Sequence, residues 1–391
     1  MKKIRQSLIF KLLVGLIIGI IVGAHANESV ISVINVLKTI SGDIIFYVVP
    51  LIILGFITPA IIGLKENAGR ILGITLTICY VSSVGAALFS YLVGLGLIPW
   101  LNVPAKAVDL RAIPEALFEL KIEPVMPVMT ALITAVVIGL GVLFTKSKTF
   151  ESLLQEFHRI VLWIVDKLVL RLLPFYIAFN FAVLAYEGGI IHELPVFLKV
   201  ILVVIVGHFI WLALLYGIAG AVSKKNPKEV FRHYGPAYMT ALGTMSSAAT
   251  LPVALRCAGR SEVLDQKIKD FTVPLCANTH LCGSVLTETF FVMVVSRLLY
   301  GQFPPLSSML VFIFLLGIFA IAAPGVPGGT VVASLGLIIS VLQFDSAGTA
   351  LMLSIFALQD SFGTACNITG DGAVSLMVTG IVERRKRKKG K

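Results

Sequence analysis

The sequence predicts an all-α integral membrane protein with eight transmembrane helices and two re-entrant helical hairpins, arranged as an inverted repeat. Three observations predict it: an apolar composition, basic charges confined to alternate loops, and two apolar stretches broken by Pro, Gly and small polar residues. Of the 391 residues, 57% are hydrophobic and 14% are charged, whereas soluble domains are roughly half apolar and a quarter charged. This composition excludes a soluble globule, a disordered chain and a fibrous repeat.

Six apolar runs within residues 1–222 have roughly the length of a bilayer crossing, about 20 residues. The first is followed by Ala24-His25-Ala26, which mimics a signal-peptide cleavage site. We expect an uncleaved helix there, because more spans follow. The linker 99–124 is the longest non-apolar stretch and is expected outside the cell. The six runs are 7–23, 44–64, 71–98, 126–144, 160–186 and 196–222.

The net charge of +11 is carried mainly by the loops. Basic residues precede the first run, follow the second, fourth and sixth runs, flank the first hairpin and fill the tail 383–391. If the runs are threaded alternately, all these clusters fall on one side. This bias predicts a multi-pass protein of the cell (inner) membrane with both termini in the cytoplasm. A basic tail placed in this way marks topology, so we expect no nucleic-acid partner.

Isolated polar groups within the spans leave their roles open. Arg171 and His208 fit a packed helix contact as well as a functional group. The five cysteines are odd in number and lie in or beside apolar runs, so no disulfide framework is expected. Cys276, His280 and Cys282 lack a fourth ligand, and we expect no metal cluster there.

The pattern changes after residue 222. The apolar stretch 230–256 is broken at 244–252, and its arms of roughly a dozen residues are too short to cross a bilayer. Arg232 and Arg256 flank it with the same charge, which predicts hairpin 1. The following helix 7, residues 265–300, holds polar residues in its first half.

The same arrangement then recurs from the opposite face. Residues 306–344 are broken at 322–330 and predict hairpin 2, and 347–382 predict helix 8. A hairpin and an interrupted helix that occur twice in opposite orientation form an inverted repeat. Unpaired backbone cannot face lipid, so the two tips must be buried in protein or line a cavity. We therefore expect residues 223–391 to form the core that holds a solute.

Helix 8 carries four polar residues on one stripe: Asp360, Thr364, Asn367 and Asp371, spaced by four, three and four. A buried carboxylate costs about 2.5 to 3.5 kcal/mol on insertion scales, which favours a functional role. We expect neither aspartate to serve as a helix cap. Eleven residues place the carboxylates about 16 Å apart, so one could take an ammonium group and the other a metal cation. This separation excludes an aspartyl protease, and we expect no enzyme.

Four strings from residue 244 onward now carry a resemblance. They are SSAATLP (246–252), PLCANTHLCGS (274–284), PGVPGG (324–329) and QDSFGTACNITGD (359–371). The chain resembles the dicarboxylate/amino acid:cation symporters, which have the glutamate-transporter fold, and the last string is most similar to their serine/threonine branch in bacteria. The resemblance implies a homotrimer with an elevator-type mechanism. Its transport domain would combine residues 223–391 with the third and sixth helices, and the other helices would form the scaffold.

The resemblance also implies the site residues. Asp360 would bind the ammonium group of an amino acid, with backbone at Met245 and Val326. Residues that hold the carboxylate or line the pocket would be Ser247, Ser284, Asn367, Thr364 and Gly363. Sodium would be held by Asp371, Asn367 and main-chain oxygens at Cys276 and His280, and a second ion by backbone at Asn278 and the hairpin 2 tip.

Two departures from the family pattern refine the expected solute and ions. Acidic-substrate members carry an arginine at the position of Gly363, and some carry one at Met245. Without a guanidinium, a buried acidic solute would leave an uncompensated charge, which predicts a small neutral amino acid. The family's Asn-Met-Asp-Gly is here the sequence 280–283, in which Cys282 is a poor ligand for a hard cation.

We therefore expect one or two coupled sodium ions. Ser82 and Ser83 lie where the family supplies hydroxyls to a third ion site, and small hydroxyl residues in membrane helices also serve as packing groups. His280 and Glu288 are candidate proton sites, although His280 fits a hydrogen-bonded filler equally well. The expected function is a secondary active symporter of a serine/threonine-like amino acid coupled to sodium. The alternatives are a proton-coupled symporter, a symporter of dicarboxylates or other amino acids with the same fold, and an uncoupled channel or solute sensor.

Overall fold

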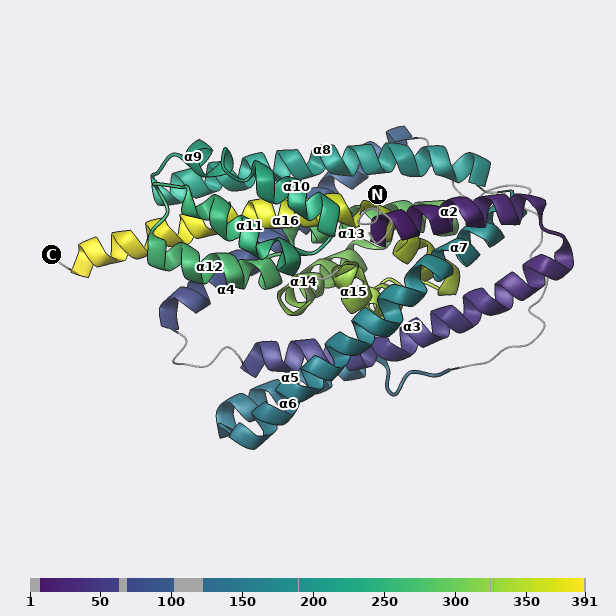
Figure 1. The fold of residues 1–391 in the computed structure, drawn as a ribbon, viewed down its shortest axis with the longest axis horizontal. Coiled ribbons are helices and arrows are strands. Elements are labelled where there is room, and N and C mark those ends of the chain that lie inside the picture. Colours follow the sequence, from purple (N-terminus) through teal and green to yellow (C-terminus); the bar gives the residue numbers. More distant parts are fainter. Residues whose placement is uncertain are drawn as a thin grey trace.

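The computed structural model describes residues 8–62, 69–101, 122–188, 190–323, 325 and 327–389. Within these residues the protein is all-helical and contains no strand (Figure 1). The predicted all-α fold class is thus confirmed for the described chain.

The first half of the chain contains the six predicted apolar runs as helices. Two of these helices begin well before the apolar run, at Glu28 and at Lys148. Hydropathy detects only the apolar part of a helix, whereas its backbone hydrogen bonds continue through polar residues. The elements are α2 (Leu8–His25), α3 (Glu28–Ile62), α4 (Gly69–Leu97), η1 (Ile98–Leu101), α5 (Val128–Thr145), α6 (Lys148–Ile164), η2 (Val165–Val169), α7 (Leu170–Glu187) and α8 (Ile190–Ser223).

The second half has the predicted pairs of short helices. The predicted interruption of helix 7 lies at His280, which adopts an extended conformation with φ −118° and ψ 91° between two helices. The interruption predicted in helix 8 is wrong, because α16 is one continuous helix. The predicted tail 383–391 is also helical as far as Lys389. The elements are α9 (Pro227–Phe231), α10 (Gly235–Thr244), α11 (Ser247–Gly259), α12 (Gln266–Thr279), α13 (Cys282–Tyr300), α14 (Leu306–Ala322), α15 (Gly329–Ser340) and α16 (Ser346–Lys389).

Six helical stretches of the described residues are long and apolar enough to cross a membrane. α2 and α5 are apolar but shorter, so the count of eight spans stays a prediction. Most of the predicted linker 99–124 lies outside the described residues. The same holds for Val326, one of the expected site residues.

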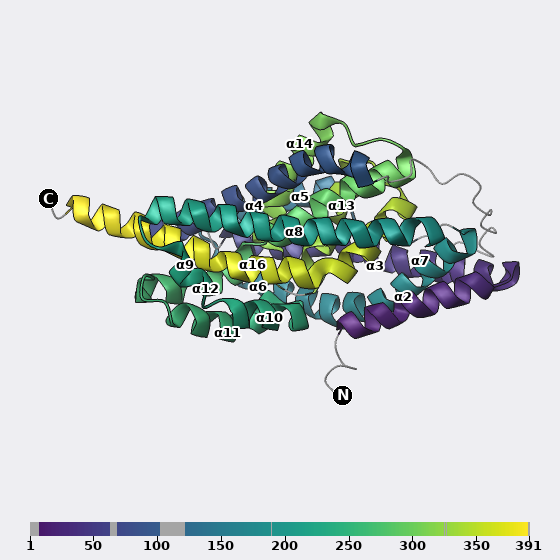
Figure 2. The ribbon, with the colours of Figure 1, turned by 90° about the horizontal axis from the view of Figure 1, so that it is seen from above.

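The core of the molecule lies around α13 and α16. The apolar stretches through α12 and α13 and through α16 are 94% and 89% buried, whereas those of α4 and α8 are 44% and 39% buried. α8, α10, α12 and α13 all pack against α16, and α8 and α16 run side by side in both views (Figures 1 and 2). The outer helices expose apolar side chains, as expected for surfaces that face lipid.

Candidate functional site

The two helical pairs, α10 with α11 and α14 with α15, meet at their tips. Met245 ends α10 in a left-handed conformation, φ 53°, which turns the chain toward α11. Ser246 then caps α11 by accepting a hydrogen bond from Ala249 N. The Ser246 hydroxyl also donates to Gly325 O at 2.7 Å, and Ala248 N donates to the same oxygen at 3.3 Å. These two hydrogen bonds bring the tips together.

Asp360 lies beside the second tip. It is 3% exposed, and its Oδ2 accepts a hydrogen bond of 2.7 Å from Gly328 N, at the N-terminus of α15. The partial positive charge of a helix N-terminus stabilises a carboxylate placed there. The expectation that Asp360 caps no helix was therefore wrong. No hydrogen bond to its other oxygen is found among the described residues.

Asn367 joins α16 to the start of α13. Its Oδ1 accepts from Gly283 N at 2.7 Å and from Ser284 N at 3.2 Å, while its Nδ2 donates to Ser284 Oγ at 2.9 Å. A Cβ on Gly363 would lie 3.3 Å from Ser284 Oγ, so a larger side chain at 363 would point at this hydroxyl. Three of the predicted solute residues are thus neighbours. Thr364 and Ser247 are buried as well, on α16 and at the start of α11.

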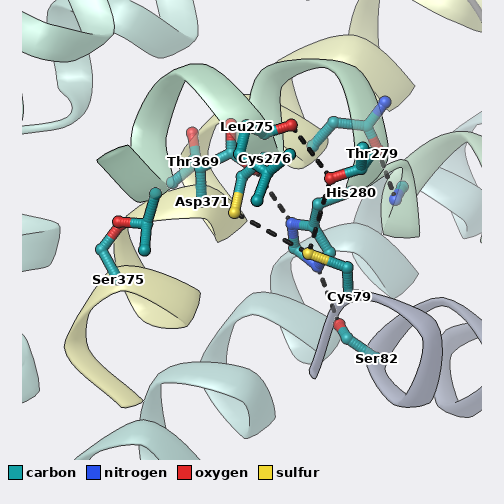
Figure 3. A network of polar contacts seen from close by, with 12 residues as sticks. Cys79, Ser82, Leu275, Cys276, Thr279, His280, Thr369, Asp371 and Ser375 are labelled. Carbon is teal, nitrogen blue, oxygen red and sulfur yellow. Dashed lines mark hydrogen bonds and ion pairs between the residues drawn. The ribbon is translucent and has the colours of Figure 1, made fainter. Parts of the chain in front are cut away.

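Asp371 lies in a second polar cluster, which Figure 3 shows from close by. His280 Nδ1 lies 3.0 Å from Asp371 Oδ1, and Ser82 Oγ lies 2.9 Å from the other ring nitrogen of His280. Both members of the pair are buried. The sulfurs of Cys79 and Cys276 lie 3.7 Å apart in the same cluster. Ser82 was expected to serve an ion site, and its hydroxyl is hydrogen-bonded to His280.

The residues around Asp371 fit a sodium ion in one respect. Asp371 Oδ2 is buried and has no hydrogen-bond partner in the described chain, and an unpaired buried carboxylate oxygen is a ligand that a hard cation favours. The oxygen of Cys276, in contrast, already accepts from His280 N at 2.8 Å. Asn278 is exposed and donates to Pro274 O at 3.3 Å. No cluster of three His, Cys, Asp or Glu side chains is found in the described residues.

A third polar network surrounds His208, and its partners were not predicted from the sequence. His208 Nε2 lies 3.1 Å from Gly283 O and 3.0 Å from Thr287 Oγ1, and Thr287 Oγ1 donates to Gln359 Oε1 at 2.9 Å. His208 therefore ties α8 to α13 beside the solute residues. A single histidine in an apolar run carries no signal that names its partner.

Glu288 is also placed in this core. It is fully buried on α13, and Ser334 of α15 donates a hydrogen bond to Glu288 Oε1. Its other oxygen has no partner in the described chain. Glu288 thus joins α13 to α15. It lies eight residues after His280 in the sequence.

Within the described residues, an all-helical chain with two helical pairs whose tips meet, and with buried carboxylates in its core, defines a polytopic membrane protein with a polar centre. The model of the "Sodium:dicarboxylate symporter family" matches residues 8–381 of the chain. The chain belongs to this family, which is one of transporters rather than enzymes. The family resemblance is therefore confirmed, whereas the serine/threonine branch stays a prediction.

Curated relatives share part of this chain. Excitatory amino acid transporter 2 of Mus musculus is 28% identical over 244 residues, which cover 60% of this chain and 41% of that protein. Excitatory amino acid transporter 3 of Homo sapiens is 30% identical over 207 residues, 52% of this chain and 37% of that protein. A putative sodium-dependent excitatory amino acid transporter of Caenorhabditis elegans is 27% identical over 164 residues, 42% and 30% of the two chains. The matched regions span less than half the length of these relatives.

Proposed function

We propose that the protein is a sodium-coupled symporter that carries a small neutral amino acid across the inner membrane, and that it works as a homotrimer with both termini in the cytoplasm. Membership of a symporter family supports the class of activity. The loop charges support the orientation. The solute, the coupling ion and the assembly are parts of the proposal.

The observation that carries the proposal is the place of Asp360. Its carboxylate is buried beside the tip of the second helical pair, and the one hydrogen bond it accepts from the described residues comes from Gly328 N–H. A buried carboxylate favours a positively charged partner. The ammonium group of an amino acid supplies that charge, and Asn367 and Ser284 lie within one cluster to hold the carboxylate at the other end of the solute.

A neutral side chain on the solute follows from the missing cation. Gly363 faces Ser284, and Met245 forms the first tip, so neither position supplies a guanidinium. A buried acidic side chain would cost several kcal/mol without a partner, roughly 3 or more. The relatives are named as excitatory amino acid transporters, and a symporter of acidic amino acids is accordingly the first alternative to test.

The sodium site of the proposal is built on Asp371, whose free Oδ2 is the observation that supports it. Asn367, four residues earlier, and main-chain oxygens near His280 would complete it. Glu288 supports a second version of the coupling, because a buried carboxyl held by Ser334 is a group that can carry a proton. Uptake measured with a sodium gradient and with a pH gradient, described next, separates sodium coupling from proton coupling.

The decisive experiment is uptake into liposomes that contain the purified protein. Radiolabelled serine or threonine should be concentrated by a sodium gradient at constant pH. Uptake driven by a pH gradient in the absence of sodium would identify protons, and not sodium, as the coupling ion. Uptake that never exceeds equilibrium would identify a channel or sensor, since a channel builds no gradient. Competition by glutamate as strong as competition by serine would reject the neutral solute.

A further inference from the structure

A groove with a volume of about 570 Å³ lies between α2 and α7, and it includes none of the residues of the polar centre. Most of its lining is apolar, but Lys11 and Arg171 also line it. Both side chains are exposed. In the described residues neither has an ion-pair partner. Two unpaired cations on an apolar groove require an explanation.

The shape of the groove follows from the way the two helices pack. A stripe of glycines on α2 brings its backbone against small residues of α7, and a Cβ on Gly15 would lie 2.5 Å from Pro174 O. The residue numbers of the contacts rise together, so the helices run parallel. Larger side chains beside the stripe, such as Phe10 and Phe175, line the groove. The close contacts are Gly15 with Pro174, Gly19 with Ala178 and Gly23 with Ala182.

The two cations lie at one depth in the membrane. Lys11 is fourteen residues before the end of α2 and Arg171 sixteen before the end of α7, which correspond to about 21 and 24 Å of helix. The hydrocarbon layer is about 30 Å thick. If α2 and α7 end at one boundary, both basic groups therefore lie within reach of the opposite headgroups, and long basic side chains extend to them. By the loop charges, this is the cytoplasmic leaflet.

We propose that the groove between α2 and α7 binds an anionic phospholipid, with its phosphate between Lys11 and Arg171 and an acyl chain along the apolar wall. A basic pocket between membrane helices on the cytoplasmic side suits an anionic headgroup. The planar guanidinium of Arg171 pairs well with phosphate. The groove also has an apolar wall, which includes Ile18 and Phe175. An acyl chain would contact this wall, whereas a free phosphate ion would not.

The proposal also settles the role of Arg171 among the alternatives that its sequence leaves open. An arginine that merely packed against a neighbouring helix would be buried and hydrogen-bonded to it. Arg171 is exposed on the groove, and no such contact is found in the described residues. Its charge therefore has no counterpart among the described residues and is available to a group that enters the groove.

The test is native mass spectrometry of the full-length protein in detergent, titrated with phosphatidylglycerol or phosphatidylcholine. We expect phosphatidylglycerol to bind selectively. The double variant Lys11→Gln with Arg171→Gln should weaken that binding about 30-fold, since each basic group near the membrane surface contributes about 1 kcal/mol. Arg159→Gln is the matched control, because Arg159 is an exposed arginine on α6 that pairs with Glu156 and lies outside the groove.

A second variant tests the acyl chain. Val14 lines the groove, and Val14→Phe should reduce phosphatidylglycerol binding while both cations remain. Equal binding of the two lipids would overturn the proposal. So would unchanged binding in the double variant, displacement of the lipid by inorganic phosphate alone, or cross-links that place a second copy of the chain in the groove. None of these outcomes depends on which solute the protein carries.

Discussion

His280 and Asp371 form a buried pair in which Nδ1 of the ring lies 3.0 Å from Oδ1 of the carboxylate. The pair joins the break between α12 and α13 to the middle of α16. Ser82 of α4 holds the opposite nitrogen of the ring. Three helices that are far apart in the sequence are therefore connected through one imidazole.

Removal of the imidazole should destabilise the protein strongly. His280→Ala removes the hydrogen-bond partner of Asp371 Oδ1 and leaves the carboxylate unpaired. An unpaired buried carboxylate costs roughly 3 kcal/mol or more. We expect a large decrease in melting temperature in sodium-free detergent, measured by circular dichroism. His25→Ala, at an exposed histidine at the end of α2, is the control. Equal decreases in both variants would contradict a structural pair.

The sodium dependence of binding should reside in Asp371. Asp371→Asn keeps the shape and an oxygen for His280 but removes the charge that a cation needs. We expect amino-acid binding, measured by calorimetry with and without sodium, to lose most of its sodium dependence. Asp270→Asn is the matched control, since Asp270 is exposed near the start of α12. A sodium response that persists in Asp371→Asn would remove this carboxylate from the ion site.

Binding of the amino acid itself should depend on the charge of Asp360. Asp360→Asn retains an acceptor for Gly328 N–H but lacks the charge that pairs with an ammonium group. A charge-assisted hydrogen bond contributes about 1.5 to 3 kcal/mol, so we expect roughly 10- to 100-fold weaker binding. The fold should be unchanged, as judged by melting temperature. Wild-type affinity in this variant would place the ammonium elsewhere.

The contact between α13 and α16 leaves no room at Gly283. A Cβ there would lie 2.5 Å from Cys366 Cβ and 2.5 Å from Gly363 O. Gly283→Ala should therefore destabilise the protein by about 1 to 3 kcal/mol. Gly217→Ala in α8 is the control, because nothing lies within 4 Å of its added Cβ. There the change should be neutral or stabilising, since Ala favours a helix over Gly.

Acid should weaken the connection between α9 and the segment that follows α11. Glu229 lies outside the membrane-spanning segments. Partial burial acts to raise its pKa, but a 2.6 Å hydrogen bond from Ser261, a second from Glu262 N and the nearby His233 outweigh it, so that the pKa is lowered. The stabilisation is therefore present above the ordinary pKa of 4.5 and is lost as pH falls through the folded-state value.

Glu229→Gln removes this titrating group. We expect the variant to show a smaller decrease in melting temperature on acidification than the unmodified protein, measured by circular dichroism across a pH series. Glu262→Gln is a matched control at an exposed neighbour. Identical acid profiles for all three proteins would show that Glu229 contributes nothing to the pH dependence.

The expected helical pairs and the polar stripe were accessible from the sequence because each depends on local properties. Arms shorter than a bilayer crossing and a spacing of four, three and four residues are visible along the chain itself. Polar residues in the first half of helix 7 indicated an interruption, but polar residues in helix 8 predicted one that the continuous α16 does not have. Helix ends at Glu28, Lys148 and Lys389 were misplaced because hydropathy ends where polarity begins, whereas the helix does not.

Composition and periodicity determined that this chain is an all-helical membrane protein and that Asp360 and Asp371 share one buried face of a helix. Only the tertiary structure decided their partners: Gly328 N–H for the first and the His280 imidazole for the second. The physical reason is that a hydrogen bond between helices depends on how they pack against each other. His280 and Ser82 lie 198 residues apart, and no local pattern records that they touch.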